Sequence, residues 1–442
     1  MYVRRVLKFG GAALADGPSV ERVCKIVLQA ADQRPVVIVS AHHGVTDLLE
    51  TVTRAAAQGS LEADRVRIRH RTLLSQLQLD PELCDRHLGE FFHLLSQVQK
   101  RGRLLPRELD FALSFGERMS TRIVAQTLQR MGVDATPVDA WDLGFTSDSN
   151  HGRARLLDGL GDSIAKAIDE VPGIAVVTGF LAKDRAGNLT TLGRNGSDLT
   201  ASVIAESIGA AEIQFWKTVG GIMTADPELV PEATVIDRLT YAEAAEYAFH
   251  GARILHPASV APTLRAQVSV RVCSVLEPDA PGTVFENEVR RGGPVGIATK
   301  REVLLLELDL DAPERRSQKL ADLFRILDEH GVTPSLLSAS GEQVSVVIDP
   351  SPGLPAVLSE LGPDAHVERG LAVAAVIGQG VGRDRTLGMK AHEALHSAGV
   401  EVTRAFLGSR DESQAFVVRE EDLPTAAKAL HGGVIADGVE TR

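Results

Sequence analysis

The chain has 442 residues, of which 44% are apolar and 24% are charged, and its formal net charge is −12 at pH 7. At roughly 100–200 residues per domain, this length predicts about two to four domains, and the apolar content excludes a disordered or low-complexity chain. The acidic balance argues against nucleic acid and anionic membranes as partners, because both attract basic surfaces. Aromatic residues, at 4%, are too few for the stacking platforms that bind single-stranded nucleic acid.

The cysteines and the apolar runs indicate the compartment. Cys24, Cys84 and Cys273 are odd in number and far apart, which excludes a disulfide framework and a Cys-x-x-Cys metal knuckle. Arg4 and Arg5 interrupt the first apolar run, so no secretory signal is expected, and no stretch reaches the roughly 20 apolar residues that span a bilayer. We therefore expect a reduced, soluble, cytoplasmic protein that does not bind membranes.

The N-terminal part of the chain alternates between apolar runs and amphipathic segments. The continuous run Val36–Val39 is typical of a strand buried on both faces of a parallel sheet, and the alternation indicates an α/β domain with a mostly parallel sheet. In chain order we predict a strand at 3–9, a helix at 19–31, a strand at 36–39, mostly helix over 48–135, a strand at 174–177, a hairpin over 183–192, a helix at 197–208 and a strand at 213–219.

The composition changes after the Pro and Gly residues at 281–282 and 290–294, which predict a linker. A strand–helix–strand pattern then occurs twice, in units of roughly 70 residues, which is typical of a paired ligand-sensing or dimerisation module. The first unit has a strand at 304–310, a helix at 320–330 and a strand at 344–348; the second has a strand at 371–377, a helix at 387–398 and strands at 400–406 and 414–418.

Three motifs resemble reactive sites, but an ordinary structural role explains each better. His392 and His396 match the zinc-protease pattern H-E-x-x-H, yet the first repeat has no matching histidines, and we interpret them as a solvated helix face. The glycines at 378–380 lack the third glycine of a dinucleotide-binding loop and predict a strand-to-helix turn. His42 and His43 have no carboxylate or thiol at metal-ligand spacing, so we interpret them as loop histidines without a metal.

Four loops combine the features that phosphoryl chemistry requires. Lys8 stands at a strand end before two glycines, where an ammonium and exposed backbone N–H groups can bind phosphate, although an ordinary strand end explains the same residues. The loop SAHHGVTD at 40–47 supplies hydroxyl groups, and GERMST at 116–121 is expected to begin a helix. GRNGSD at 193–198 joins the hairpin to a helix, with Ser197 as the expected N-cap and free amides directed at an anion.

These loops are similar to those of one enzyme family. The segments KFGG, SAHHGVTD, SFGERMST, TGF, TLGRNGSD, GGIMTADP and GARILHP resemble the aspartate kinases in order and spacing. The resemblance implies the amino-acid kinase fold, a three-layer α/β sandwich with a mostly parallel sheet, over residues 1–290. It also implies two α+β, ferredoxin-like ACT domains at 295–366 and 367–442, a homodimer formed through them, and a monofunctional enzyme without a dehydrogenase module.

The implied reaction transfers the γ-phosphoryl group of ATP to the β-carboxylate of L-aspartate, giving 4-phospho-L-aspartate, the first step of the aspartate-family amino-acid pathway that leads to lysine and threonine. This agrees with the residues, because a carboxylate with a pKa near ~4 is already ionised and needs no general base. Mg²⁺ is expected to arrive on the ATP phosphates, since no dedicated metal cage is visible.

The resemblance also assigns roles to single residues. Lys8 would contact the β- and γ-phosphates, and Asp198 would organise the transfer site. Arg194 would bind the α-carboxylate of aspartate as a bidentate fork, Glu117 would pair with its α-ammonium group, and hydroxyl groups would come from Ser40, Thr46 and Ser197. The implied ATP-binding residues are Lys8, Gly10, Gly11, Lys217, Thr218, Met223, Asp226 and Arg253.

Several positions depart from the family pattern. Ala12 and Ala13 replace Thr-Ser after KFGG, Thr218 replaces a carboxylate, and Glu228 stands where arginine is common near the phosphates, while Arg253 replaces a lysine and keeps its charge. These departures leave two alternatives open: a kinase for a related acidic amino acid in a specialised pathway, and a regulatory ACT-bearing subunit with a degenerate kinase site.

The ACT region departs further from the family pattern. Gly341 replaces an expected glutamate, the segments at 318–321 and 334–335 differ from the family motifs, and 408–412 blurs the motif of the second unit. We therefore hypothesise that feedback inhibition by lysine or threonine is weak or lost.

Overall fold

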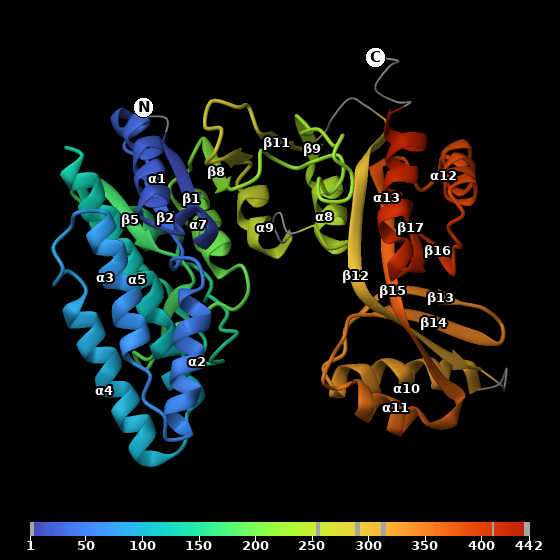
Figure 1. Ribbon diagram of the computed structural model, residues 1–442, viewed down its shortest axis with the longest axis horizontal. Helices are drawn as coiled ribbons and strands as arrows, with labels where there is room; N and C mark the ends of the chain where they lie inside the picture. The colour runs from blue at the N-terminus through green and yellow to red at the C-terminus, as the bar shows by residue number, and fades with distance from the viewer. Residues whose placement is uncertain (1–3, 253–256, 288–291, 311–314, 409–410, 437–442) are drawn as a thin grey trace. The chain divides into compact units, whose positions relative to one another are not determined.

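The computed structural model describes residues 4–252, 257–287, 292–310, 315–408 and 411–436, and the chain divides into two compact units (Figure 1). The first unit consists of Met1–Ile222 and Leu255–Glu286, and the second of Met223–Ile254 and Asn287–Arg442.

A twisted sheet forms the centre of the first unit, with strand order β3-β5-β2-β1-β8-β10-β11. All neighbouring pairs are parallel except β10 and β11, which are antiparallel. This confirms the predicted mostly parallel sheet, although the proline and glycine at 281–282 end the loop between β10 and β11 and do not lie in a linker. The bounds are β1 (Arg5–Phe9), β2 (Val36–Val39), β3 (Ala135–Val138), β5 (Ile174–Thr178), β8 (Glu212–Lys217), β10 (Ser269–Ser274) and β11 (Thr283–Glu286).

Helices cover both faces of this sheet. Leu7 and Phe9 of β1 pack into a core formed with the helices that precede β3, whereas Val6 and Lys8 point to the opposite face, where α7 packs on β1. Alternate residues of one strand therefore belong to two different layers. The helices are α1 (Gly17–Gln29), α2 (Val45–Ala57), α3 (Asp64–Gln76), α4 (Asp85–Arg101), α5 (Pro106–Arg130), α6 (Gly161–Glu170), α7 (Gly196–Ser207) and α9 (Pro257–Arg265).

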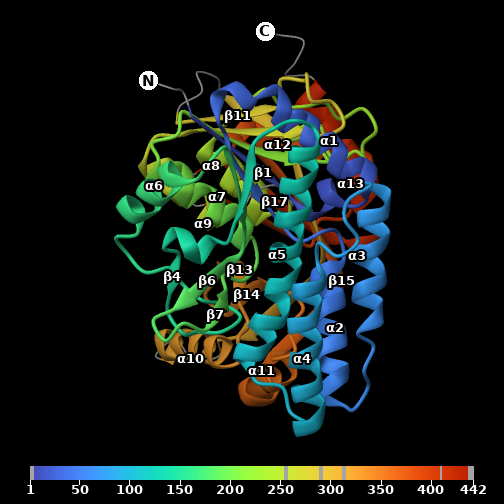
Figure 2. The ribbon, with the colours of Figure 1, turned by 90° about the vertical axis from the view of Figure 1, so that its left-hand side faces the viewer.

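Helices α2, α4 and α5 lie side by side (Figure 2) and confirm the mostly helical segment predicted at 48–135. The expectation that GERMST begins a helix is wrong, because these residues lie in the middle of the 25-residue α5. The helix begins at Pro106, and the Glu108 carboxylate accepts a hydrogen bond from the Leu105 N–H at 3.0 Å. Despite this length, α5 carries many polar residues, and across the described ranges we find no helix both long and apolar enough to cross a bilayer.

The predicted hairpin is present as β6 (Leu181–Asp184) and β7 (Leu189–Thr191), which pair antiparallel. The short strand β4 (Thr146–Ser147) adds to β6 in parallel, so a small second sheet forms in the first unit. Its β7 strand leads directly into the loop before α7. The hairpin therefore positions the GRNGSD segment.

The second unit contains an antiparallel sheet in the order β13-β14-β12-β15-β17-β16. This α+β arrangement agrees with the expected ACT fold. The elements are β9 (Arg238–Thr240), α8 (Tyr241–Phe249), β12 (Gly293–Asp309), α10 (Arg316–Glu329), β13 (Pro334–Ala339), β14 (Gln343–Ile348), α11 (Leu354–Leu361), β15 (Ala365–Gln379), α12 (Arg385–Ser397), β16 (Arg404–Leu407), β17 (Ser413–Arg419) and α13 (Leu423–Leu430).

Two strands of this sheet are longer than predicted. β12 has 17 residues and β15 has 15, and they pair along most of their length. Gly293 and Pro294 already belong to β12, so this part of the predicted linker is wrong, while residues 290 and 291 lie outside the described residues. A strand can extend through a Pro–Gly segment because proline's missing N–H is tolerated near a strand end. The strand predicted at 400–406 is limited to Arg404–Leu407.

Two separate apolar cores lie along these long strands. One packs α12 and α13 against the N-terminal part of β12 and the C-terminal part of β15, and the other packs α10 and α11 against their remaining parts (Figure 1). The two repeats predicted from sequence thus share their central strands.

The structure also confirms the ordinary roles of two of the motifs that resemble reactive sites. His392 and His396 are exposed on α12, and the His392 ring lies edge-on to Phe416, with centroids 5.1 Å apart. Gly378 lies near the end of β15, and Gly380, with φ +79°, begins the turn that leads to α12.

Candidate active site

A cavity of about 450 Å³ opens in the first unit beside the carboxyl ends of β1 and β2, where ligands commonly bind in open α/β sheets. Most of the residues proposed for phosphoryl chemistry line it. These are Lys8, Gly10, Gly11, Ser40, Thr46, Glu117, Ser197, Asp198 and Lys217. Segments that are far apart in the sequence are therefore brought together as the motifs suggested.

An ion pair lies in this cavity between β1 and α7. The Nζ of Lys8 is 2.5 Å from Oδ1 of Asp198, and the two residues are 6% and 3% exposed. The Oδ1 atom lacks a directed hydrogen bond among the described residues, so the contact is electrostatic attraction at short range. Burial of both partners keeps this attraction strong and holds the ammonium group at the end of β1.

Two helix N-termini meet at the same cavity. Gly44, Thr46 and Asp47 line it from the start of α2, and Gly196, Ser197 and Asp198 line it from the start of α7. The first turn of a helix carries unpaired N–H groups and a partial positive charge. The cavity therefore suits an anionic ligand.

The start of α7 differs from its prediction. Ser197 is not the N-cap, because the helix begins at Gly196 and the N-cap is Asn195, which adopts the left-handed conformation with φ +60°. A Cβ on Gly196 would lie 2.8 Å from the Phe180 ring, so only glycine fits at this first helical position. Ser197 consequently lies inside the first turn and lines the cavity.

Glu117 reaches the cavity from α5. Its Oε1 accepts a hydrogen bond from the Ala41 N–H at 3.1 Å, while Oε2 has no hydrogen-bond partner among the residues that the structure describes. Burial raises the pKa of this carboxyl group to about 7, and the Ala41 N–H and the Lys8 charge oppose the rise. Gly116 lets the helix approach this closely, since a Cβ there would lie 2.8 Å from the Cβ of Ala41.

The two loop histidines have different environments. His42 is buried and its Nδ1 lies 2.9 Å from the carbonyl oxygen of Leu14, with the ring of His70 at 6.3 Å. Burial lowers the pKa of His42 to about 3, with the His70 charge adding to the effect, so this ring stays neutral. His43 is exposed and lines the cavity. The structure places the loop histidines as predicted, and sequence reasoning missed that both line the cavity.

Sequence reasoning also missed other residues that line the cavity: Ala12, Asp47, Phe180 and Asn195. Their only signal was position, because each lies in or beside a motif already singled out. Ala12 directly follows Gly11, and Asn195 lies between Arg194 and Gly196. Phe180 is the last residue of the TGF segment and follows β5, and its ring lies beside Gly196, a neighbour that no local pattern predicts.

The remaining proposed site residues lie in different places. Arg194 is exposed and stands between Gly193 and Asn195, which both line the cavity. Lys217 ends β8, and burial lowers its pKa, with Asp198 opposing and Lys8 adding to the effect.

Three other implied ATP-binding residues, Thr218, Met223 and Asp226, do not line this cavity. Thr218 is exposed after β8, and Met223 and Asp226 belong to the second unit, where the Asp226 carboxylate accepts a hydrogen bond from the Glu228 N–H at 3.0 Å. Arg253 lies outside the described residues.

The described residues contain no side-chain cage for a metal ion. Over the described part of the chain, no group of three or more His, Cys, Asp and Glu side chains is arranged to hold a metal ion. A cation held mainly by the phosphate oxygens of a nucleotide is compatible with this arrangement.

Comparison with known proteins identifies the family. The family model for the amino acid kinase family matches residues 3–274. Aspartokinase 1, chloroplastic, of Arabidopsis thaliana is 31% identical over 98% of this chain and 80% of the relative's length. The chain belongs to the aspartokinases.

Other aspartokinases match along almost the whole chain. The lysine-sensitive aspartokinase 3 of Escherichia coli is 29% identical, with 97% of this chain and 98% of the relative covered. The crystal structure of E. coli aspartokinase III in complex with aspartate and ADP has a TM-score of 0.82 at 29% identity and covers 98% of this chain and 99% of that one. These matches confirm the resemblance seen in the motifs and the implied fold.

Proposed function

We propose that this aspartokinase transfers the γ-phosphoryl group of ATP to the β-carboxylate of L-aspartate and releases ADP and 4-phospho-L-aspartate. The observation that carries the proposal is the buried ion pair of Lys8 and Asp198 between two helix N-termini in one cavity. A relative of the same family has been solved with aspartate and ADP, the substrate and the nucleotide product of this reaction.

The chemistry requires little more than positioning and charge neutralisation. An oxygen of the aspartate β-carboxylate attacks the γ-phosphorus, the bond to the β-phosphate oxygen breaks, and no proton is transferred because the carboxylate is ionised. Lys8 and the first turns of α2 and α7 neutralise the charge on the transferring group. Asp198 orients the Lys8 ammonium through their ion pair.

Three residues are proposed to recognise aspartate. The free Oε2 of Glu117 pairs with the α-ammonium group, and the Arg194 guanidinium binds the α-carboxylate in two parallel hydrogen bonds. The hydroxyl groups of Ser40, Thr46 and Ser197 bind the remaining oxygen atoms. Arg194 is flanked by Gly193 and Asn195, both with positive φ, and this loop presents it at the rim of the cavity.

The nucleotide is proposed to contact Gly10, Gly11, Lys217 and Thr218 in the first unit, and Met223, Asp226 and Arg253 beyond it. Mg²⁺ would neutralise the phosphate charge and be held mainly by phosphate oxygens, in keeping with the lack of a side-chain cage among the described residues.

We propose a kinase domain at residues 1–290 and ACT domains at 295–366 and 367–442. We also propose a homodimer formed through the ACT domains. The proposed location is the cytoplasm, where the three free cysteines would stay reduced.

The test is a hydroxylamine trap. The chain is incubated with ATP, Mg²⁺, hydroxylamine and a panel of acidic amino acids, and acyl phosphate is detected as its hydroxamate. We expect product with aspartate and a loss of at least about 10²-fold in Lys8→Ala. Product with another acidic amino acid in place of aspartate would support a specialised kinase, and no product with any of them would support a regulatory subunit. Unchanged turnover in Lys8→Ala would contradict the catalytic role of Lys8.

A further inference from the structure

Helix α5 carries a second buried carboxylate, Asp110, two turns before Glu117 and on the same side of the helix. Glu117 lines the cavity, whereas Asp110 is absent from its lining. The Asp110 side chain is only 1% exposed. A fully buried carboxylate requires several donors to offset the loss of water, so its partners show what it organises.

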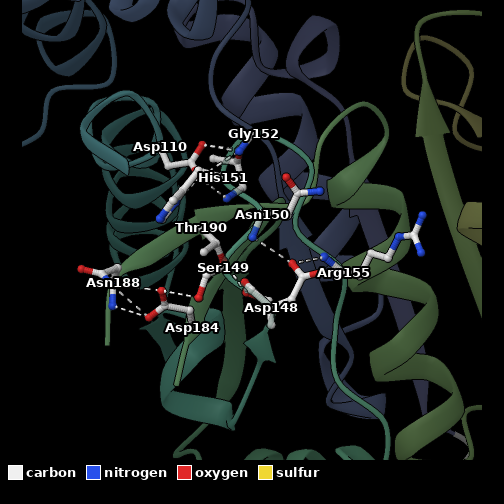
Figure 3. A network of polar contacts seen from close by, with 12 residues as sticks. Asp110, Asp148, Ser149, Asn150, His151, Gly152, Arg155, Asp184, Asn188 and Thr190 are labelled. Carbon is white, nitrogen blue, oxygen red and sulfur yellow. Dashed lines mark hydrogen bonds and ion pairs between the residues drawn. The ribbon is translucent and has the colours of Figure 1, made fainter. Parts of the chain in front are cut away.

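Those partners come from two segments distant in sequence (Figure 3). The Thr191 hydroxyl donates to Oδ1 at 2.7 Å and the Thr191 N–H to Oδ2 at 3.3 Å. The Gly152 N–H lies 3.1 Å from both carboxylate oxygens, and Nδ1 of His151 lies 2.9 Å from Oδ2. One carboxylate thus ties the end of β7 to the loop that follows β4.

Both tied segments support the loop that carries Arg194. Thr191 is the last residue of β7 and precedes Arg194 by three positions. The other segment lies against Gly193, because a Cβ on Gly193 would be 3.4 Å from the carbonyl oxygen of Gly152. The Ala154 N–H also donates to the carbonyl of Thr191 at 2.9 Å. The contacts around Asp110 therefore hold Thr191, where the Arg194 loop begins, and Gly152, which packs against Gly193 of that loop.

A second set of hydrogen bonds holds the segment after β4, residues 148–155, in its conformation. Oδ1 of Asp148 accepts hydrogen bonds from the N–H groups of Asn150 and Arg155, at 3.2 and 3.0 Å. The Ser149 hydroxyl donates to Asp184 at 3.0 Å. These hydrogen bonds hold the segment after β4 against the hairpin, and the contacts of Asp110 link the same segment to α5 (Figure 3).

We propose that Asp110 is a positioning residue that sets the orientation of Arg194 and thereby the affinity for the amino-acid substrate. The proposal rests on the proposed function, in which Arg194 binds the α-carboxylate of aspartate. Lys8 and Asp198 lie on β1 and α7 and have no contact with Asp110, so the loss of Asp110 changes recognition of the amino acid and leaves the bound nucleotide in place.

Asp110→Asn tests this with little change of shape. The amide NH2 group is a donor, so in place of Oδ2 it would face the N–H groups of Gly152 and Thr191 and their hydrogen bonds to that atom would be lost. We expect the KM for aspartate to rise about tenfold, with the KM for ATP and the kcat at saturating aspartate within about twofold of wild type. Asp139→Asn is the matched control, because Asp139 is a buried carboxylate that pairs with Arg122 of α5 and is not bonded to the loop after β4 or to β7, and the KM of this variant for aspartate should stay within about twofold.

The outcomes separate this inference from the function on which it rests. Absence of hydroxamate from the wild-type chain would overturn the proposed function. A wild-type chain that turns over aspartate, together with a folded Asp110→Asn variant of unchanged KM, would overturn only the positioning role. Equal losses in kcat and in both KM values would also overturn it, because they indicate general loosening of the fold. If Asp110→Asn does not fold, Thr191→Val removes only one donor and should give a smaller rise in the same KM.

Discussion

The Nζ of Lys8 and Oδ1 of Asp198 lie 2.5 Å apart, although their residues are separated by almost the whole first unit in sequence. Parallel strand β1 and helix α7 meet here, and the pair is almost completely buried. An ion pair of this kind is costly to break on one side, since the remaining charge stays buried without a partner. The Asp198 carboxylate is therefore paired with the Lys8 ammonium group without any ligand.

Replacing Asp198 by Asn should leave the shape of α7 intact and remove the charge that holds the Lys8 ammonium. We expect kcat for aspartate phosphorylation to fall by about 10²-fold or more, measured by the hydroxamate assay. Asp139→Asn is the matched control: Asp139 is buried and paired with Arg122 but does not line the cavity, so it should change kcat by less than about twofold. An Asp198→Asn enzyme with near wild-type kcat would contradict the assignment.

The affinity for aspartate should depend on pH through Glu117. Burial raises the pKa of this carboxyl to about 7, so it is protonated and uncharged below that pH and cannot pair with the α-ammonium group of the substrate. We expect the KM for aspartate to rise as the pH falls below 7, by up to about tenfold per unit, and to be constant above it. Initial rates between pH 5.5 and 8.5 provide the measurement.

Glu117→Gln is the control for this pH profile. It removes the titrating group and should give a high KM for aspartate that no longer changes around pH 7, with the KM for ATP unaffected. A wild-type profile that is flat across the same range, or a Gln variant that keeps the inflection, would show that another group controls binding.

Gly116 should be required for the close approach of α5 to the loop after β2. Alanine in a helix interior normally stabilises a protein by about 1 kcal/mol relative to glycine. Here the added Cβ would lie 2.8 Å from the Cβ of Ala41, so we expect Gly116→Ala to lower the free energy of unfolding by about 1–3 kcal/mol and to weaken aspartate binding.

Gly89 of α4 provides the comparison, because it is exposed and a Cβ there would meet no atom within 4 Å. Gly89→Ala should therefore stabilise the protein by up to about 1 kcal/mol. Urea unfolding of both variants measures the difference, and a stabilising effect at both positions would mean that the loop yields to the new methyl group.

Feedback inhibition should be weak. Gly341 removes the carboxylate expected at that position, and the segments at 318–321 and 334–335 also differ from the family motifs. We expect lysine and threonine at millimolar concentrations to change the rate by less than about twofold, with the lysine-sensitive E. coli enzyme as the positive control. Strong inhibition by either amino acid would contradict this. Residues 409 and 410 of the altered second motif lie outside the described residues.

Much of the fold was predictable because its signals are local. The four apolar residues of β2 match their prediction residue for residue, and the ends of β8 and α7 shift by only one or two positions. The glycine and proline signals were less dependable. The pair at 281–282 lies in the loop between β10 and β11 of the kinase sheet, and Gly293 begins the longest strand described, because sheet pairing can override local preference.

The sequence by itself determined the family and supplied the residues proposed for the reaction, because Lys8, Glu117, Arg194 and Asp198 stand in the family motifs. Only the tertiary structure decided where the residues of those motifs lie within their helices and relative to the cavity. GERMST is the middle of a helix because Pro106 and Glu108 start that helix ten residues earlier, and Ser197 is displaced from the cap because Gly196 must fit beside Phe180. Asp110 carries no motif at all. Its proposed positioning role rests only on the four donors from distant segments that contact its carboxylate. Because the carboxylate is buried, the loss of any one of these hydrogen bonds is not offset by water.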